Sequence, residues 1–305
     1  GLPGGRAASA HALLTSMLDG FEVTTIDTGE AAIHVRHAGS GPPLLLLHGY
    51  PQTGVMWHAV APLLADAFTL VVPDLRGYGR SSKPPTTVDH WPYTKRAMAH
   101  DQVAVMRALG FERFAVCGHD RGARVGYRMA LDHPERVTRL AVLDIIPTGD
   151  TWRQADAAFG RGYWHWFFLA QKAPLPERMI AADPDAYYAS RGGMDAFAPE
   201  ALAEYRRWAT EPETLHAMCE DYRAAATLDL EHDERDRTMR RRIACPVLAL
   251  WGAQNFLQEW YDVLAHWRAW AAGDVQGRAL HCGHYLPEER PEETAAELRA
   301  FFAGR

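Results

Sequence analysis

The sequence contains no long hydrophobic run and few cysteines. Its apolar runs are short, and Leu44–Leu47 is typical of the longest. A transmembrane helix needs about 20 consecutive apolar residues, so the sequence predicts no membrane span. None of the cysteines belongs to a CxxC pair, so we expect reduced thiols and a cytoplasmic protein. The cysteines are Cys117, Cys219, Cys245 and Cys282.

An excess of positive charge is also missing. Of the 305 residues, 32 are Lys or Arg and 38 are Asp or Glu, which gives a net charge of −6. Binding to nucleic acid or to an anionic membrane usually requires a basic excess, so we expect neither partner. The glycine-rich start of the chain lacks the apolar centre of a signal peptide. We interpret residues 1–10 as a flexible or vector-derived tail.

Short apolar strands that alternate with helical patterns are the main feature of the chain. Two alternating segments, Phe21–Asp27 and Ala31–His37, predict a β-hairpin. Beyond them, helical patterns separate most of the apolar runs, which predicts an α/β fold with a mostly parallel sheet and helices on both faces. The expected later strands are Leu44–Leu47, Thr69–Val72, Phe114–Cys117, Leu140–Leu143, Val247–Trp251 and Val275–Leu280. The expected helices are Trp57–Ala67, Thr94–Leu109, Arg121–Leu131, Gln258–Trp270 and Glu292–Phe302.

One long interval breaks this alternation. Between Pro147 and about Thr238 no segment has the pattern of a core strand, and the interval contains many aromatic residues, Pro and Gly breaks and polar helical stretches. We therefore predict a helical cap over residues 148–238, inserted between a first core segment (1–147) and a second one (239–305). We expect the charged stretch Glu231–Arg242 to form the exit from the cap, mostly as a solvated face.

The strongest local motif is Gly118-His119-Asp120-Arg121-Gly122. An expected strand precedes it and an expected helix follows it, which is the strand–turn–helix context of a nucleophile elbow. Glycines on both sides permit a tight turn, because a Cβ there would clash. Such an elbow holds the side chain of Asp120 exposed at the start of the helix. The other interpretation of Asp120 is an ordinary helix cap.

An aspartate at the centre of an elbow restricts the chemistry. A carboxylate is ionised at neutral pH but is a weak nucleophile toward esters and amides. Its productive targets are saturated carbons that carry a leaving group, such as alkyl halides and epoxides. Attack by Asp120 gives an alkyl ester, and hydrolysis of that ester requires a general base and an oxyanion hole.

These segments resemble the α/β-hydrolase superfamily over nearly the whole chain. The similar loops are His48–Pro51, which resembles the oxyanion loop, Asp74–Ser82, and Gly283–Pro287, which resembles the loop of the catalytic histidine. The resemblance implies an α/β-hydrolase fold, with a mostly parallel eight-stranded sheet and the inserted cap. It also implies an oxyanion hole formed by the backbone N–H groups of Tyr50 and Arg121.

A histidine and an acid complete a site of this kind. We expect His284 to be the base rather than His281, because the glycine before His284 matches the family pattern. In this family the acid follows the sixth or the seventh strand. No carboxylate follows the expected strand that ends at Trp251, whereas Asp144 follows Leu140–Leu143, where an aspartate needs a partner in order to be buried. We therefore expect Asp144 to orient His284; the other interpretation is a structural aspartate bonded to backbone donors.

Two arginines indicate the charge of the substrate. Arg121 and Arg124 lie three residues apart in the first turn of the expected helix, on one face. Cations at a helix N-terminus are unfavourable by about 0.3–1 kcal/mol each, so we expect a compensating interaction. A substrate carboxylate supplies it, because a guanidinium group binds a carboxylate through two hydrogen bonds. The other interpretation is pairing with nearby acids, such as Asp132 or Glu135.

The expected cap contains donors for a departing halide. Tyr163–Phe168 is a run of aromatic-type residues, and Cys219–Ala224 adds a tyrosine. Indole, imidazole and phenol groups can all donate hydrogen bonds to a halide in a dry pocket. Together with the elbow, these segments resemble the haloacetate dehalogenases, specifically the fluoroacetate dehalogenases.

The narrower resemblance implies a role for each polar residue. His165, Trp166 and Tyr222 bind the halide, and Arg121 and Arg124 bind the carboxylate of the substrate. The remaining aromatic residues of the cap run are expected to pack. Tyr50 departs from the phenylalanine that we expect after His-Gly, and this affects the expected substrate preference rather than the reaction.

The expected activity is hydrolysis of a haloacetate, with fluoroacetate as the favoured substrate, to glycolate and halide through an ester on Asp120. We expect no metal and no organic cofactor, since the sequence shows no ligand cluster and no phosphate-binding loop. The halo-acid is the expected partner, and members of this family are often homodimers. Two alternatives remain: an epoxide hydrolase with the same nucleophile, and a hydrolase-like protein that binds ligands without catalysis. The epoxide alternative requires two cap tyrosines, for which Tyr222 is one candidate and Tyr163, Tyr187, Tyr188 or Tyr205 is the other.

Overall fold

An eight-stranded sheet forms the centre of the molecule in the computed structural model, which describes residues 17–304. The expected tail at residues 1–10 lies outside the described residues. The strand order is β1-β2-β4-β3-β5-β6-β7-β8. Strand β2 is antiparallel to both β1 and β4, and the other neighbours are parallel. The strands are β1 Glu22–Asp27, β2 Ala32–Ala38, β3 Pro43–Leu47, β4 Thr69–Pro73, β5 Phe114–His119, β6 Val137–Leu143, β7 Val247–Gly252 and β8 Val275–Leu280.

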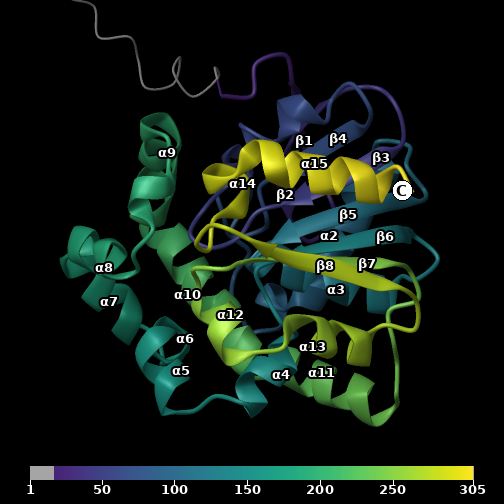
Figure 1. Cartoon of the computed structure of the whole chain (residues 1–305). Coiled ribbons are helices and arrows are strands. Elements are labelled where there is room, and N and C mark those ends of the chain that lie inside the picture. Colours follow the sequence, from purple (N-terminus) through teal and green to yellow (C-terminus); the bar gives the residue numbers. More distant parts are fainter. Residues whose placement is uncertain (1–16, 305) are drawn as a thin grey trace, which may run out of the picture.

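Helices cover both faces of this sheet, as Figure 1 shows. In β3, Leu45 and Leu47 belong to one buried cluster, while Leu44 and Leu46 belong to a second one. Alternate residues of a strand point to opposite faces, so a strand buried on both sides is apolar throughout. On the first face lie α2 Lys95–Ala108, α3 Arg121–Asp132 and α13 Val263–Trp270. On the second face lie η1 Gly54–Trp57, η2 Ala61–Leu63 and α15 Pro291–Phe302.

A helical insertion separates β6 from β7. Its helices α5 to α10 gather beside the sheet in Figure 1, and α11 packs against α4 where the insertion begins. The helices are α4 Thr148–Arg153, α5 Ala157–Gly162, α6 His165–Leu169, α7 Leu175–Ala182, α8 Pro184–Ser190, η4 Met194–Ala196, α9 Pro199–Ala209, α10 Pro212–Ala226 and α11 Leu228–Thr238. The remaining short elements are η3 Trp91–Tyr93, α12 Phe256–Trp260 and α14 Leu286–Glu289.

Two of the expected helices differ from the structure. Trp57–Ala67 is not an α-helix but short 3₁₀ turns, because Pro62 lies in its middle and has no N–H group to donate to a preceding carbonyl. Gln258–Trp270 is divided into α12 and α13. Asp262 begins the second helix, and its side chain accepts a hydrogen bond from the backbone N–H of Ala265.

The expected solvated face at Glu231–Arg242 is confirmed for most of its residues, and two of its acids are exceptions. Asp233 and Asp236 of α11 are buried, at 2% and 1% exposure, and both pair with Arg128 of α3. The distance from Arg128 Nη2 to Asp233 Oδ1 is 2.7 Å. A buried arginine in a distant helix thus holds these acids, and charge patterning along the chain does not show such a partner. Within residues 17–304, no helix is long and apolar enough to cross a membrane.

Candidate active site

Asp120 occupies the sharp turn between β5 and α3. Its backbone has φ 49° and ψ −116°, a conformation that non-glycine residues rarely adopt. The backbone after β3 packs closely against Gly122 in this turn. Only glycine fits there, since a Cβ on that residue would lie 2.4 Å from the carbonyl oxygen of His48. The Asp120 side chain faces a cavity and the residue is 9% exposed. The structure therefore has the strand–turn–helix geometry of a nucleophile elbow.

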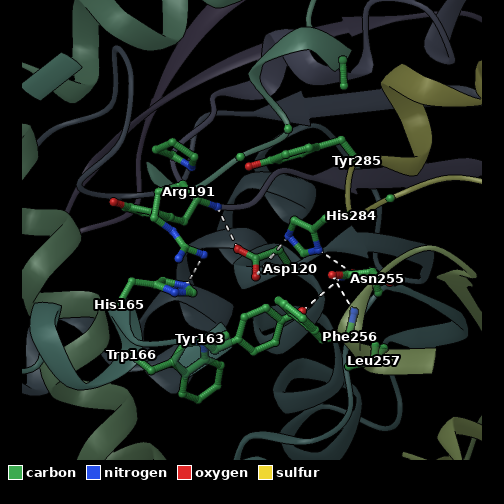
Figure 2. Close-up of a pocket in the computed structure, with 18 of the residues that line it drawn as sticks. Asp120, Tyr163, His165, Trp166, Arg191, Asn255, Phe256, Leu257, His284 and Tyr285 are labelled. Atoms are coloured by element: carbon green, nitrogen blue, oxygen red, sulfur yellow. Dashed lines mark hydrogen bonds and ion pairs between the residues drawn. The ribbon is translucent and has the colours of Figure 1, made fainter. Parts of the chain in front are cut away.

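His284 and Asp144 lie beside the elbow, at the same edge of the sheet. The loops after β5, β6 and β8 meet there, because the carboxyl ends of parallel strands lie at one edge. His284 Nδ1 is 2.5 Å from Asp144 Oδ2, and His284 Nε2 is 3.8 Å from Asp120 Oδ2 (Figure 2). His281, the other candidate, is exposed and lies 3.1 Å from Gln254 Nε2.

Two further donors hold the carboxylate of Asp144. The backbone N–H of Gly252 donates to Oδ1 at 2.8 Å, and the side-chain amide of Asn255 donates to Oδ2 at 2.5 Å. The Asn255 amide also contacts Tyr163 Oη at 3.1 Å. The loop after the seventh strand contains no carboxylate, as the sequence indicates. Asn255, which stands in that loop, instead orients the acid of the sixth strand.

The electrostatic balance keeps Asp120 ionised. Burial alone raises the pKa of Asp120, but the charges of His284 and Arg121 outweigh burial and hold the pKa below its usual value. Burial likewise lowers the pKa of His284, but the hydrogen bond and charge of Asp144 outweigh it, so the pKa of His284 is raised above 6.5. Asp120 is therefore held as a carboxylate, and the imidazole of His284 beside it is more basic than an ordinary histidine.

His119 supports the histidine loop, a role that the sequence did not indicate. Its Nε2–H donates to the backbone carbonyl of His284 at 2.7 Å. Burial, followed by the charge of His284, lowers the pKa of His119 to about 4. His119 is therefore neutral at physiological pH and acts as a hydrogen-bond donor to the loop.

The loop after β3 brings a backbone donor to Asp120. The N–H of Tyr50 donates to Asp120 Oδ1 at 2.9 Å. The approach is close: a Cβ on Gly49 would lie 2.5 Å from Asp120 Cβ. His48 stabilises the loop by accepting from the N–H of Leu75 and by donating to the carbonyl of Gly49, both at 2.9 Å. Arg121, the other expected oxyanion donor, is the first residue of α3 directly after Asp120.

A cavity of about 550 Å³ lies between the sheet edge and the insertion. Core residues Asp120, Arg124 and His284 line it together with residues of the insertion. Figure 2 shows Asp120 and His284 facing His165, Trp166 and Arg191 of the insertion. Those from the insertion include Tyr163, His165, Trp166, Arg191 and Tyr222. Residues 17–304 contain no cluster of His, Cys, Asp or Glu side chains that could hold a metal ion.

The two expected carboxylate-binding arginines have different surroundings. Arg121 is fully buried and pairs with Asp221 of α10 rather than with Asp132 or Glu135, at 2.6 Å from its Nη2 to Oδ1. Its Nη1 is buried without a hydrogen-bonding partner. The surroundings of Arg124 differ, because none of the ion pairs in the described chain includes it.

Arg124 is instead held by neutral oxygens. Its Nη1 donates to the carbonyl of Ile146 and to Thr148 Oγ1, both at 3.1 Å, while its Nε is buried and unpartnered. Its guanidinium carbon lies 4.6 Å from the centre of the Trp166 ring. A buried guanidinium without a carboxylate is costly, and Arg124 lines the cavity. Its surroundings therefore leave a place for an anionic ligand.

The three expected halide donors lie together on the insertion side of the cavity. His165 and Trp166 belong to α6, and Tyr222 belongs to α10. The ring of Tyr222 is 5.5 Å from that of His165 and 6.1 Å from that of Trp166. Within residues 17–304, neither Trp166 Nε1 nor Tyr222 Oη has a hydrogen-bonding partner. Both groups are therefore available to a ligand.

Sequence reasoning did not find Arg191, which also lines the cavity. It follows α8, in a segment Arg191-Gly192-Gly193 whose sequence resembles an ordinary loop. Its Nη2 atom is 3.4 Å from His165 Nε2. Only the position of α8 against the core brings Arg191 to the site.

Comparison with known proteins agrees with this architecture. The family model of the alpha/beta hydrolase fold matches residues 42–291. A fluoroacetate dehalogenase from Burkholderia sp. is 46% identical over 94% of this chain and 95% of its own length. A soluble epoxide hydrolase from Corynebacterium sp. (strain C12) is 34% identical over 89% of this chain and 93% of its own.

Solved structures show the same likeness. An α/β hydrolase from Nostoc sp. PCC 7120 superimposes with a TM-score of 0.91 at 54% identity, over 94% of this chain and 100% of that one. A protein from Pseudomonas aeruginosa assigned as an epoxide hydrolase superimposes with a TM-score of 0.87 at 46% identity, over 94% and 96% of the two chains. With its sheet, its elbow and these full-length relatives, the chain belongs to the α/β-hydrolase family.

Proposed function

We propose that this chain is a hydrolytic dehalogenase of haloacetates, fluoroacetate included, which releases glycolate and halide. The observation that carries the proposal is the pairing of an elbow aspartate, Asp120, with a buried arginine that has no carboxylate partner, Arg124. The aspartate selects a saturated carbon with a leaving group, and the arginine selects a negatively charged substrate. The similarity to the Burkholderia fluoroacetate dehalogenase supports the same function.

The first step is displacement at carbon. Arg124, which lines the cavity, orients the carboxylate of the substrate. Arg121 does not line the cavity, and its unpartnered Nη1 adds positive charge from behind the lining residues. A carboxylate oxygen of Asp120 then attacks the methylene carbon from the side opposite the halogen. A carbon–oxygen bond forms, the carbon–halogen bond breaks, and its electron pair leaves with the halide toward His165, Trp166 and Tyr222.

The second step is hydrolysis of the ester on Asp120. His284, oriented by Asp144 at 2.5 Å and neutral in this step, takes a proton from water through Nε2. The hydroxide attacks Cγ of Asp120, and the N–H of Tyr50 stabilises the oxyanion where it now contacts Oδ1. Collapse of the intermediate expels the alkoxide, which takes the proton back from His284 and leaves as glycolate. The Asp120 carboxyl group then loses its proton to solvent.

An epoxide hydrolase is the second candidate, supported by the Corynebacterium relative. It requires a partner tyrosine for Tyr222, and of the four cap tyrosines named above only Tyr163 lines the cavity. The hydroxyl groups of the others bond elsewhere: that of Tyr187 to Tyr50, that of Tyr188 to the carbonyl of Ala209, and that of Tyr205 to Glu288. In the epoxide hypothesis, Arg124 also has no anionic partner, because a simple epoxide carries no charge.

A panel of substrates tests the proposal. Purified protein is supplied with fluoroacetate, chloroacetate, bromoacetate and a small uncharged epoxide, and release of halide or diol is measured. We expect halide from the haloacetates and little diol. Turnover of the epoxide without halide release would support the epoxide hydrolase. If the protein released neither halide nor diol, the result would support a binding protein without catalysis.

A further inference from the structure

Arg191 brings a third guanidinium group to the cavity, from the insertion. The residue follows directly after α8, and none of the ion pairs among the described residues includes it. An arginine side chain stays charged at any physiological pH. A cation without a carboxylate partner therefore faces the space where substrate binds, and the two chemical steps above do not use it.

The guanidinium group of Arg191 lies against His165. The distance from Arg191 Nη2 to His165 Nε2 is 3.4 Å, and Figure 2 shows the two side chains pointing toward each other. Burial, and next the charge of Arg191, lower the pKa of His165 well below its usual value. His165 is therefore neutral, and Arg191 is the cation that lies directly against it.

Tyr50 fixes the position of this charge relative to the nucleophile. Its hydroxyl group hydrogen-bonds to that of Tyr187 in α8, at 2.9 Å. Its ring stacks on His165, with the ring centres 6.2 Å apart and an interplanar angle of 18°. Its backbone N–H donates to Asp120 at 2.9 Å. One residue thus holds α8, and with it Arg191, around the same space as His165 and Asp120.

We propose that Arg191 is the cationic member of the halide site, an inference that rests on the proposed dehalogenase function. In-line displacement drives the halide away from Asp120, which belongs to the core, and toward the insertion. There His165, Trp166 and Tyr222 are neutral donors, and the nearby guanidinium groups of Arg121 and Arg124 lie against the faces of the Trp166 and Tyr222 rings. Arg191 places a full positive charge next to them, where negative charge develops as the carbon–halogen bond breaks.

The rates with different haloacetates should depend on Arg191 to different degrees. A fixed charge stabilises the transition state in proportion to the negative charge on the departing atom. Fluoride is the poorest leaving group of the series and depends most on this stabilisation. Loss of Arg191 therefore slows fluoroacetate more than bromoacetate, whereas loss of a carboxylate-binding group slows both equally.

Halide release in a single turnover tests this order in three variants. Arg191→Gln removes the positive charge, and Arg191→Lys keeps a positive charge but replaces the guanidinium group with an ammonium group. Arg178→Gln removes an exposed positive charge from α7 of the same insertion and serves as the matched control. In Arg191→Gln we expect release of fluoride to fall by about 10- to 100-fold and release of bromide to fall less. We expect Arg191→Lys to recover part of the loss, and Arg178→Gln to behave as the original protein.

Two results would overturn the proposal. Equal losses with both haloacetates, accompanied by a raised KM in steady-state kinetics of the same variants, would make Arg191 a carboxylate-binding residue. Equal losses that lysine does not recover, with KM unchanged, would make its role structural.

A binding measurement separates this proposal from the proposed function. The ³⁵Cl NMR linewidth of chloride is recorded with the original protein and with Arg191→Gln, in the absence of any substrate. We expect the protein to broaden the line and Arg191→Gln to remove most of the added width. Equal broadening by both proteins would contradict a halide site at Arg191. If the protein releases no halide from any haloacetate, the proposed function fails, while broadening that depends on Arg191 still establishes an anion site.

Discussion

At the scale of single residues, the chemistry depends on Asp120. Serine at this position would need a base before it could attack, whereas a carboxylate is ready at neutral pH and selects saturated carbon. Burial opposes ionisation of Asp120, and His284 and Arg121 reverse that effect. The same histidine is therefore an electrostatic partner in the first step and a base in the second.

Replacement of His284 separates the two steps. In His284→Asn, Asp120 still attacks, but no base activates water, so hydrolysis slows by about 10²–10⁴-fold. We expect the glycolyl ester to accumulate, and mass spectrometry of the peptide that contains Asp120 should show the added mass. His281→Asn is the control, because His281 is exposed and bonds to Gln254, and we expect its turnover to be unchanged. Absence of the adduct from His284→Asn would contradict the covalent mechanism.

Replacement of Arg124 tests the selection of charge. In Arg124→Leu, loss of a charged hydrogen bond to the substrate lowers kcat/KM for bromoacetate by about 10- to 100-fold. Bromoacetamide has the same size and no charge, so we expect its kcat/KM to change little. Steady-state kinetics with both compounds measure the difference. A similar fall for both would show that Arg124 acts on folding or on the nucleophile rather than on the carboxylate.

At the scale of secondary-structure elements, α14 connects the histidine loop to the loop after β3 and to the insertion. Glu288 of α14 accepts a hydrogen bond from Gln52, which directly follows the oxyanion loop, at 2.6 Å and from Tyr205 of α9 at 2.8 Å. Its side chain is 1% exposed and lies 3.9 Å from His58. Burial raises the pKa of Glu288 to about 8, and nearby Glu289 adds to the effect.

Glu288 makes stability depend on pH. The folded protein keeps the proton on Glu288 up to about pH 8, while the unfolded chain loses it near 4.5. Stability from this group is therefore full below 4.5 and declines as pH rises toward 8. In Glu288→Gln we expect this decline, on the order of a few kcal/mol, to disappear.

Urea unfolding at about pH 5 and about pH 8 measures the effect. The control is Glu292→Gln, at an exposed position of α15, which should follow the original protein at both pH values. An equal decline in Glu288→Gln and in the original protein would assign the pH dependence to other groups.

At the scale of the whole molecule, buried charges join the insertion to the core. Asp221 of α10 pairs with Arg121 of α3 at 2.6 Å and also with Lys95 of α2. Tyr78 donates to the same carboxylate at 2.7 Å. These positive partners outweigh burial and hold the pKa of Asp221 below its usual range. The insertion thus provides the anion that neutralises Arg121, the residue directly after the nucleophile.

Removal of this anion affects the entire fold. In Asp221→Asn, Arg121 and Lys95 are left buried with less compensating charge, so we expect a loss of about 3–5 kcal/mol in the free energy of unfolding. Asp185→Asn is the control, because Asp185 forms an exposed pair with Arg206 at 3.4 Å and should lose less than about 0.5 kcal/mol. Urea denaturation measures both. Losses of similar size would contradict the joining role of Asp221.

The sequence predicted the parts of this fold that depend on local signals. The elbow around Asp120 and the strands of the sheet are marked by glycines and short apolar runs, and the structure contains them. Partners supplied by distant elements had no such signal. Asp221 neutralises Arg121, although the two residues are 100 positions apart in the sequence. Arg191 reaches His165 because α8, which precedes it, is bonded to Tyr50 through Tyr187. Spacing along the chain does not show either contact.

Isotope incorporation into Asp120 is the most direct test of an ester intermediate on that residue. The enzyme turns over fluoroacetate many times in H₂¹⁸O, and the peptide that contains Asp120 is then weighed by mass spectrometry. Because water attacks Cγ of the ester, the account predicts ¹⁸O in the carboxyl group of Asp120. Label in glycolate alone, with none in Asp120, would mean that water attacks the substrate directly and would contradict the account.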